Sequence, residues 1–358
     1  MNSNIKKVLI LRLSALGDSI HTLPLAYAIK KTYPNCEIGW VVEDKAQQFI
    51  KDNPLVDKCY VIPKKDWIKH RFNLIYIYKS FRDIINEINA QNYDVVLDVQ
   101  QLFKSACLLP FLNIKRKITL SGGREFSSFF SNEIYEQSHC LFDPDYHIVL
   151  RNLEFAKHIG ADTSDVKFVL SEPSVDVKEK ISLLLSETDV KKPTVVFAPA
   201  TTWDNKHWKE EFWGIALTFL KGKANIVFTG TDSDITLIKR ILTHSDSLES
   251  DVTILAGKTN LSELAELFRR VDLVISPDSG SVHLAWAVSK PAIISLFTAT
   301  AENRTAPFGE NCYVLAPKLD CRPCSKRKCR LTKQANLCCE LVKPQQLIDL
   351  ICQVLHFE

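Results

Sequence analysis

The sequence predicts an α/β protein built from two doubly wound domains, each with a parallel sheet between layers of helices. Short runs rich in Val, Ile and Leu alternate along the whole chain with longer amphipathic stretches, which is typical of βαβ units. The length of 358 residues suits two domains of about 150 residues, each large enough to bury its own core. Hydrophobic residues make up 46% and charged residues 24% of the chain, which excludes a disordered or fibrous protein.

The first half begins with an apolar run at residues 8–11, which Arg12 interrupts and Asp18 soon follows. We therefore expect a buried first strand there, because a secretory signal would need an apolar region of about 7–15 residues. The expected strands cover residues 7–13, 37–42, 58–62 and 93–99, with a weaker one at 117–120. The expected helices cover residues 19–33, 45–52, 79–91, 103–109 and 148–158.

A polar, serine-rich segment at residues 173–192 is expected to be a linker region that carries one helix over 175–186. It separates a first domain over 1–172 from a second over 193–340, and a C-terminal helix lies within 341–358. The expected strands of the second domain cover residues 194–199, 224–229, 252–256, 273–276 and 292–297. The expected helices cover residues 208–220, 235–242, 262–270, 281–289 and, at the carboxyl end, 344–355.

Four of the eleven glycines follow a predicted strand: Gly17, Gly230, Gly257 and Gly280. In open α/β sheets, ligands bind at the carboxyl ends of the strands. A glycine there lets the backbone approach a ligand closely and exposes amide groups to phosphate. An ordinary strand-to-helix turn explains any single glycine of this kind equally well.

Two of the strand-to-helix loops carry polar residues suited to a ligand site. Asp18 lies between the first strand and the next helix, where its carboxylate either caps the helix or faces the ligand. The first loop of the second domain contains Thr201, Thr202 and Lys206. Hydroxyl donors and a lysine charge suit a diphosphate, and the alternative is a solvated loop.

A third loop contains Asp278, Ser279 and Gly280 at the end of a strand, with His283 one turn into the following helix. The helix amino terminus and the serine make this loop a candidate anion site. His283 is either a phosphate ligand or a histidine packed in the core.

Five stretches, taken together, resemble glycosyltransferase family 9, the bacterial ADP-heptose:lipopolysaccharide heptosyltransferases. No single stretch is decisive, but the five occur in the correct order over nearly the whole chain. They are residues 8–24 (VLILRLSALGDSIHTLP), 40–43 (WVVE), 93–106 (YDVVLDVQQLFKSA), 200–208 (ATTWDNKHW) and 276–287 (SPDSGSVHLAWA).

The resemblance implies a GT-B architecture, in which two Rossmann-like domains face each other across a cleft. It also implies an inverting transfer of heptose from ADP-heptose to the inner core of lipopolysaccharide, with no cofactor required for catalysis. The acceptor would be Kdo-lipid A or heptosyl-Kdo-lipid A. The enzyme would be cytoplasmic and peripheral at the inner membrane of a Gram-negative bacterium. A net charge of +3 is too small to indicate a nucleic-acid partner.

The same resemblance assigns roles to individual residues. Asp18 matches the general base that takes the proton of the acceptor hydroxyl. Asp234 matches an acidic residue that binds the donor ribose. The full set of residues matched to donor binding is Thr201, Thr202, Lys206, Asp234, Asp278, Ser279, Gly280 and His283.

A basic segment at residues 64–71 (KKDWIKHR) interleaves its charges with Trp67. A solvated helix face is the plain alternative for such a segment, and attraction to an anionic membrane surface, at about 1 kcal/mol per basic residue, is another. The resemblance assigns to the acidic acceptor the residues Lys64, Lys65, Lys69, Arg71 and Arg124.

The chain departs from the family pattern at two places in the sugar pocket. Gln101 stands where the family usually has glycine. Thr298-Ala299-Thr300 stands in place of Gly-Pro-Thr after the last predicted strand.

Seven of the eleven cysteines lie between Cys312 and Cys352. A Cys-x2-Cys pair followed by two further cysteines has the ligand count of a tetrahedral structural zinc site. Reduced thiols in a compact loop, or a disulfide or redox role, are the alternatives, although the expected cytoplasmic setting disfavours a disulfide. The zinc ligands would be Cys321, Cys324, Cys329 and Cys338.

Other functions are compatible with the same patterns. One is a related transferase or an epimerase that uses another nucleotide sugar. Another is a non-catalytic nucleotide-binding scaffold with a zinc-stapled C-terminal module, which the presence of both Asp18 and Lys206 argues against. Addition of the first heptose is favoured by the WVVE stretch, whereas the cysteine segment favours addition of the second.

Overall fold

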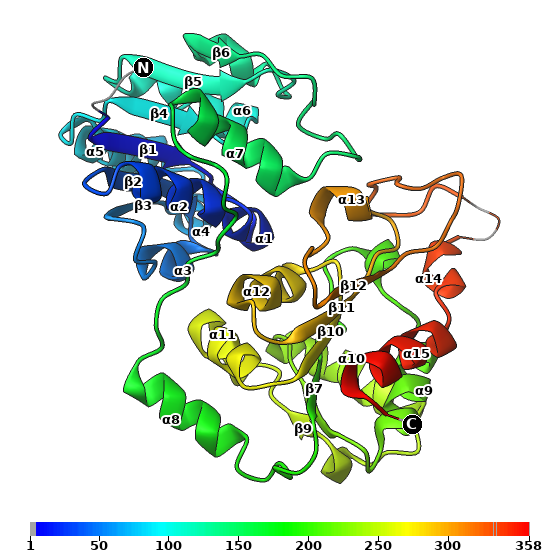
Figure 1. The fold of residues 1–358 in the computed structure, drawn as a ribbon. Helices are drawn as coiled ribbons and strands as arrows, with labels where there is room; N and C mark the ends of the chain where they lie inside the picture. Colours follow the sequence, from blue (N-terminus) through cyan, green and yellow to red (C-terminus); the bar gives the residue numbers. More distant parts are fainter. Residues whose placement is uncertain (1–4, 332, 334, 358) are drawn as a thin grey trace. The chain divides into compact units, whose positions relative to one another are not determined.

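A computed structural model describes residues 5–331, 333 and 335–357. The chain divides into two compact units, Met1–Ser171 and Glu172–Glu358, and each has a sheet flanked by helices (Figure 1). The segment expected to be a linker belongs to the second unit, because its helix α8 (Val175–Leu184) packs against α11 (Leu261–Arg269). Lys180 Nζ of α8 lies 2.8 Å from Glu263 Oε2 of α11.

Within the described residues, the first unit has one parallel sheet of six strands in the order β3-β2-β1-β4-β5-β6. The strands are β1 (Lys7–Leu11), β2 (Glu37–Glu43), β3 (Lys58–Ile62), β4 (Val95–Asp98), β5 (Arg116–Leu120) and β6 (Glu133–Tyr135). The helices are α1 (Leu16–Ile20), α2 (Leu23–Thr32), α3 (Gln47–Lys51), α4 (Lys64–Lys69), α5 (Leu74–Asn89), α6 (Phe103–Ala106) and α7 (Ile148–His158).

The described part of the second unit repeats this plan, with six parallel strands in the order β12-β11-β10-β7-β8-β9. The strands are β7 (Thr194–Phe197), β8 (Asn225–Phe228), β9 (Thr253–Ile254), β10 (Leu273–Pro277), β11 (Ala292–Leu296) and β12 (Cys312–Leu315). Besides α8 and α11, the helices are α9 (Glu210–Leu220), α10 (Ile235–Thr243), α12 (Gly280–Val288), α13 (Glu302–Thr305), α14 (Cys338–Leu341) and α15 (Pro344–Leu355).

Both sheets have the strand order of a Rossmann fold, so the prediction of two doubly wound α/β domains with a C-terminal helix is confirmed. The order reverses between β1 and β4 in the first sheet and between β7 and β10 in the second. Ligands of such sheets bind at this switch point, beside the carboxyl ends of the two central strands. Ligand-binding residues are therefore expected in the loops that follow these four strands.

The predicted boundaries fail where a single pattern covers two elements. One helix is expected over residues 19–33, but α1 ends at Ile20 and α2 begins at Leu23 with Pro24 in its first turn, where proline is well tolerated. The edge strands β6 and β12 are not predicted, because they are short and alternate only weakly. In the described residues, no helix is both long and apolar enough to span a membrane.

Candidate active site

One group of candidate residues gathers at the switch point of the second sheet. Lys206 lies in the loop after β7 and Asp278 directly follows β10, and Lys206 Nζ is 2.6 Å from Asp278 Oδ2. His283 Nε2, from α12, is 3.2 Å from Asp278 Oδ1. The Thr300 hydroxyl donates to Asp278 Oδ2 at 2.7 Å. Three residues singled out in the sequence thus form one cluster, and Thr300 adds a fourth.

The Asp278 carboxylate is buried and charged. Burial by itself raises the pKa of a carboxyl group, but the hydrogen bond with His283 and the positive charge of Lys206 outweigh it and hold the pKa of Asp278 far below its usual range. His283 is also buried, and its contact with the cluster is the one between its Nε2 atom and the Asp278 carboxylate. Trp203, which falls in the stretch 200–208 that carries the family resemblance, lies with its ring centroid 4.4 Å from Lys206 Nζ, in the geometry of a cation–π contact.

The amino terminus of α12 adds backbone donors beside this cluster. Ser279 is the N-cap residue and Gly280 is the first residue of the helix. The Ser279 hydroxyl lies 3.0 Å from the Ser276 hydroxyl and does not cap the helix. The N–H groups of the first turn therefore suit an anion, as the sequence predicts.

The remaining predicted donor residues lie in neighbouring loops. Thr201 and Thr202 follow β7, the first half-buried and the second exposed. Asp234 follows β8, one strand further from the switch point, and its Oδ2 accepts the backbone N–H and the hydroxyl of Thr231, each at 2.7 Å. Asp234 therefore shapes its own turn, outside the contacts of the Lys206–Asp278 cluster.

An arginine whose side chain is only 7% exposed holds the turn that follows β11, and the sequence does not single it out. Arg322 donates to the carbonyl oxygens of Phe297 at 3.2 Å and Thr300 at 3.1 Å, and also to that of Thr298. Glu302 lies 2.9 Å from its guanidinium. Because Thr300 bonds to Asp278, Arg322 fixes one wall of the cluster. This contact explains how Thr298-Ala299-Thr300 is held in the turn where the family pattern has Gly-Pro-Thr.

The C-terminal cysteines are free thiols, and one of them, Cys339, packs against the same loops. The Cys339 thiol donates to the Asn205 carbonyl at 3.4 Å, and the Asn205 side chain donates to the Lys326 carbonyl at 2.6 Å. In the described part of the chain, no three His, Cys, Asp or Glu side chains gather so that they could hold a metal ion. The four predicted zinc ligands, Cys321, Cys324, Cys329 and Cys338, thus do not gather in this structure, and the zinc site stays a prediction.

Asp18 lies at the switch point of the first sheet, in the third position of α1. Its Oδ2 accepts the backbone N–H of Ala15 at 3.0 Å, and Arg12 Nη2 lies 2.7 Å from its Oδ1. The N-cap alternative is wrong because Ala15 is the N-cap residue of α1. Asp18 is the third residue of the helix, and its carboxylate accepts the backbone N–H of the N-cap residue, as an acidic residue at this position does in a capping box. The Asp18 side chain is 37% exposed but that of Arg12 only 4%, so the carboxylate is accessible while its partner is buried.

Two further charged residues stand at the same edge of the first sheet. Glu43 ends β2 and Lys104 lies in α6, with Lys104 Nζ 3.0 Å from Glu43 Oε1. Lys104 also donates to the Ser14 hydroxyl, and Lys64 Nζ lies 3.3 Å from Glu43 Oε2. The sequence contained a signal for Glu43 and Lys104, because both fall in stretches that carry the family resemblance.

Asp98, the last residue of β4, completes this edge. It is fully buried, and burial raises the pKa of its carboxyl to about 6, against the opposing hydrogen bonds of Ser105 and Gln101 and the charge of Arg12. The Gln101 backbone N–H donates to Asp98 Oδ1 at 3.1 Å. A buried titratable group thus lies close enough to Arg12 for the guanidinium charge to act on it.

The raised pKa of Asp98 predicts a pH-dependent stability. The folded state holds this proton more tightly than the unfolded chain, so the contribution of Asp98 to stability is fully present below pH 4 and is lost as the pH rises through about 6. From the usual value of 3.8 to about 6, the loss should be up to about 3 kcal/mol. Urea unfolding of the wild type and of Asp98→Asn between pH 4.5 and 7.5 measures it. If the free energy of unfolding changed equally with pH in the two proteins, the raised pKa of Asp98 would be contradicted.

The other departure from the family pattern also has a structural basis. Gln101 has φ of 53°, a left-handed conformation that favours glycine. Its buried side-chain amide donates to the Leu120 carbonyl at 2.6 Å and to the Thr119 hydroxyl at 3.1 Å, which stabilises this conformation. Arg124 lies beside it, since its backbone N–H donates to the Gln101 carbonyl at 3.2 Å.

The predicted acceptor residues do not form one cluster. Lys64 joins Glu43, whereas Lys65, Lys69 and Arg71 are exposed on α4 and just after it. The guanidinium of Arg124 lies 4.8 Å from the ring centroid of Phe142, in the loops that follow β5 and β6.

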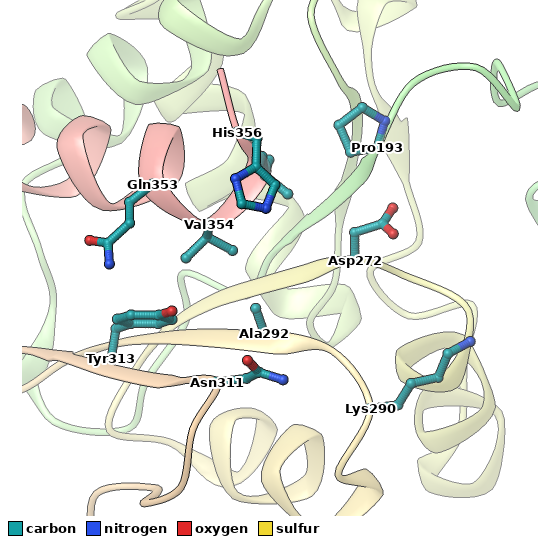
Figure 2. Close-up of a pocket in the computed structure, with 10 residues that line it drawn as sticks. Pro193, Asp272, Lys290, Ala292, Asn311, Tyr313, Gln353, Val354 and His356 are labelled. Atoms are coloured by element: carbon teal, nitrogen blue, oxygen red, sulfur yellow. The ribbon is translucent and has the colours of Figure 1, made fainter. Parts of the chain in front are cut away.

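A separate pocket of about 530 Å³ lies at the opposite edge of the second sheet, with His356 and Gln353 at the end of α15 beside it (Figure 2). Asp272 and Ala292 line it from the amino ends of β10 and β11. Since ligands of open α/β sheets bind at the carboxyl ends, this pocket is not the active-site candidate.

Comparisons with known proteins agree with this geometry. The model of glycosyltransferase family 9 (heptosyltransferase) matches residues 81–335. Lipopolysaccharide heptosyltransferase 1 of Campylobacter coli is 29% identical over 317 residues, which are 84% of this chain and 86% of that protein. The enzyme of the same name from Escherichia coli K12 is 29% identical over 342 residues, 92% of this chain and 98% of that protein.

The solved structure of E. coli heptosyltransferase WaaC with ADP has the same fold. It superimposes with a TM-score of 0.74 at 24% identity, over 97% of this chain and 99% of that one. The predicted GT-B architecture is therefore confirmed. The family model and the named heptosyltransferases show that the chain is a glycosyltransferase enzyme. The matched family model, which covers most of the chain, identifies it as a member of glycosyltransferase family 9.

Proposed function

We propose that this protein transfers heptose from ADP-heptose to the Kdo-containing inner core of lipopolysaccharide. The observation that carries the proposal is the cluster at the switch point of the second sheet, where a lysine, a buried aspartate and the amino terminus of α12 come together. These groups suit a nucleoside diphosphate. The names of the similar proteins, lipopolysaccharide heptosyltransferase 1, and the ADP in the WaaC structure support the choice of donor and acceptor.

In the proposed reaction, the acceptor hydroxyl attacks the anomeric carbon of heptose and the bond to ADP breaks, with inversion. Asp18 takes the proton of the hydroxyl as general base. Lys206 and the N–H groups of α12 stabilise the charge that develops on the departing diphosphate. Arg12 holds the Asp18 carboxylate in place through their 2.7 Å contact.

We further propose that no divalent cation is needed. The Asp278 carboxylate in this cluster is already paired with the Lys206 ammonium group and in contact with the His283 ring. Lys206 supplies the positive charge that a metal ion would otherwise bring.

Because the acceptor is anchored in lipid, the proposal places the enzyme at the cytoplasmic face of the inner membrane. Lys64, Lys65, Lys69, Arg71 and Arg124 would then contact the carboxylates and phosphates of the acceptor. Addition of the first heptose is favoured by the named relatives.

The test is an activity screen with ADP-heptose and Kdo-lipid A acceptors that carry no heptose or one heptose. We expect ADP release and heptosylation of the acceptor that lacks heptose. Consumption of ADP-heptose without an acceptor would favour an epimerase. Binding of ADP without turnover on either acceptor would favour a nucleotide-binding scaffold.

The basic residues of the acceptor side give a separate prediction. Replacing Lys69 and Arg71 by Ala should raise KM for a deacylated, soluble acceptor several-fold, because contacts to acidic groups are lost, and should make that KM less sensitive to salt. KM for ADP-heptose should stay unchanged. Initial rates at varied acceptor and salt concentrations measure both quantities. A rise in donor KM alone would reassign these residues to the donor.

A further inference from the structure

The apolar stripe of α5 continues beyond the core on which the helix packs. Ile85 and Ile88 are buried against the first sheet, and Phe81 is partly buried beside them. One and two turns towards the amino end, Tyr78 and Leu74 continue the same stripe at helical spacing. Their side chains are 63% and 73% exposed, so the amino-terminal third of the helix presents an apolar face that no described part of the chain covers.

Neighbouring residues enlarge this exposed face. Ile75 is 70% exposed and Phe72, just before the helix, is 87% exposed. We call Phe72, Leu74, Ile75 and Tyr78 the apolar tip. Single exposed apolar side chains are ordinary on a protein surface, but four within seven residues are not.

Hydrogen bonds hold the apolar tip on an ordered support. The Trp67 indole N–H of α4 donates to the Ser80 hydroxyl of α5 at 3.0 Å. The Tyr76 hydroxyl donates to the Asp66 carboxylate at 2.6 Å. The Asn73 side chain accepts the Tyr76 N–H as the cap of α5. The α4–α5 pair therefore presents these side chains from a fixed scaffold.

Basic residues flank the apolar tip along the chain, and of these Lys64 pairs with Glu43 and Arg82 with Asp83. Residues 64–82 contain six Lys or Arg residues and a single acidic residue, Asp66, whereas the whole chain has a net charge of only +3. Aromatic and aliphatic side chains with basic residues close by suit the interface of an anionic bilayer, where the aromatic rings enter the headgroup region and the basic groups meet lipid phosphates.

We propose that the apolar tip and the basic residues that flank it dock the protein on an anionic lipid surface. The inference deepens the proposed function, since a lipid-anchored acceptor must be met at such a surface. Charge argues against a second copy of this chain as the occupant, because two such faces would bring strongly positive segments together without compensating acidic residues.

Vesicle sedimentation of the full-length protein tests this without nucleotide sugar or acceptor. The protein should bind vesicles that contain about one-third phosphatidylglycerol, should bind phosphatidylcholine vesicles much more weakly, and should lose affinity as salt rises. Equal binding to both lipids, or none to either, would overturn the proposal.

Variants assign the binding to the apolar tip. The double variant Leu74→Ser/Ile75→Ser should lower the partition into anionic vesicles about tenfold or more, because two apolar side chains no longer enter the bilayer. The charge variant Lys79→Glu/Arg82→Glu should weaken it on anionic vesicles only. The matched control is Leu183→Ser/Leu248→Ser, whose side chains are similarly exposed at 74% and 68% but lie on the second unit. Wild-type binding by the Leu74/Ile75 variant would overturn the proposal.

Kinetics separate this inference from the proposed function. The Leu74/Ile75 variant should turn over a deacylated acceptor as the wild type does, and an acceptor embedded in vesicles more slowly. A defect on the soluble acceptor would place the apolar tip in the acceptor site and overturn the docking role. If no heptose transfer were found on any acceptor, the proposed function would fail while the vesicle result stood. Light scattering that shows a dimer dissociated by the variant would identify a second copy as the occupant.

Discussion

Asp18→Asn is expected to lower kcat by a factor of about 10²–10⁴, the usual range for loss of a general base. The asparagine keeps one oxygen that accepts the Ala15 N–H or meets the Arg12 guanidinium, but it has no basic group to take the acceptor proton. ADP affinity should stay close to that of the wild type, because the donor residues lie on the other unit. Single-turnover rates with saturating acceptor, together with calorimetry of ADP binding, measure the two effects.

Asp57 provides a matched control for this change. Its carboxylate also accepts a backbone N–H, that of Ile38 at 2.6 Å, and also pairs with a basic side chain, Lys30 at 2.7 Å. It is 38% exposed, against 37% for Asp18. Asp57→Asn should therefore cost comparable stability and leave kcat unchanged. A similar fall in kcat for both variants, or near-wild-type turnover in Asp18→Asn, would leave Asp18 with a structural role only.

Lys206→Ala should weaken ADP binding by about 1.5–3 kcal/mol, tenfold or more, because a charge-assisted contact to the diphosphate is lost. It should also lower the free energy of unfolding, by about 3–5 kcal/mol if the buried Asp278 charge is left without this partner. Calorimetry with ADP at a temperature where the variant is fully folded, and urea unfolding, measure the two losses. An unchanged ADP affinity would remove Lys206 from the donor site.

The control for this variant is Lys180→Ala, which removes the partner of the largely buried Glu263 on the same unit. It should lower stability without affecting ADP binding. A chelator provides a second check, because EDTA should change neither ADP affinity nor turnover if Lys206 supplies the positive charge. Loss of activity in EDTA that Mg²⁺ restores would contradict the proposal that no metal is needed.

The fold was predictable because each central strand is a short apolar run followed by its own helical pattern. The boundaries of β3, α7 and α15 agree with the predicted ranges because burial, periodicity and end signals coincide there. The edge strands β6 and β12 were missed because each is short and pairs with only one other strand. Their residues are partly exposed, so the sequence shows no clear run of apolar residues there.

The candidate site was predictable only in part, for a related reason. Polar residues after a strand stand out in a sequence, so Asp18, Lys206 and Asp278 were found. Their partners are distant in sequence and come together only in the fold, so a local sequence pattern does not reveal them. Arg322, in the C-terminal segment, contacts the turn after β11, and Glu43 contacts Lys104, sixty-one positions away. The sequence identifies Arg12 only as the residue that ends an apolar run, whereas its guanidinium pairs with the Asp18 carboxylate.

The ion pair between Lys206 and Asp278 has a consequence for turnover. A free lysine would attract the diphosphate of the product as strongly as that of the substrate, and such uniform binding slows the release of ADP without accelerating the transfer. Here the buried aspartate offsets much of the lysine charge before any ligand arrives. The attraction should be felt most when the glycosidic bond breaks and the leaving phosphate gains negative charge. The residue that holds the lysine in position thereby lowers, without abolishing, an affinity for ADP that would otherwise slow product release.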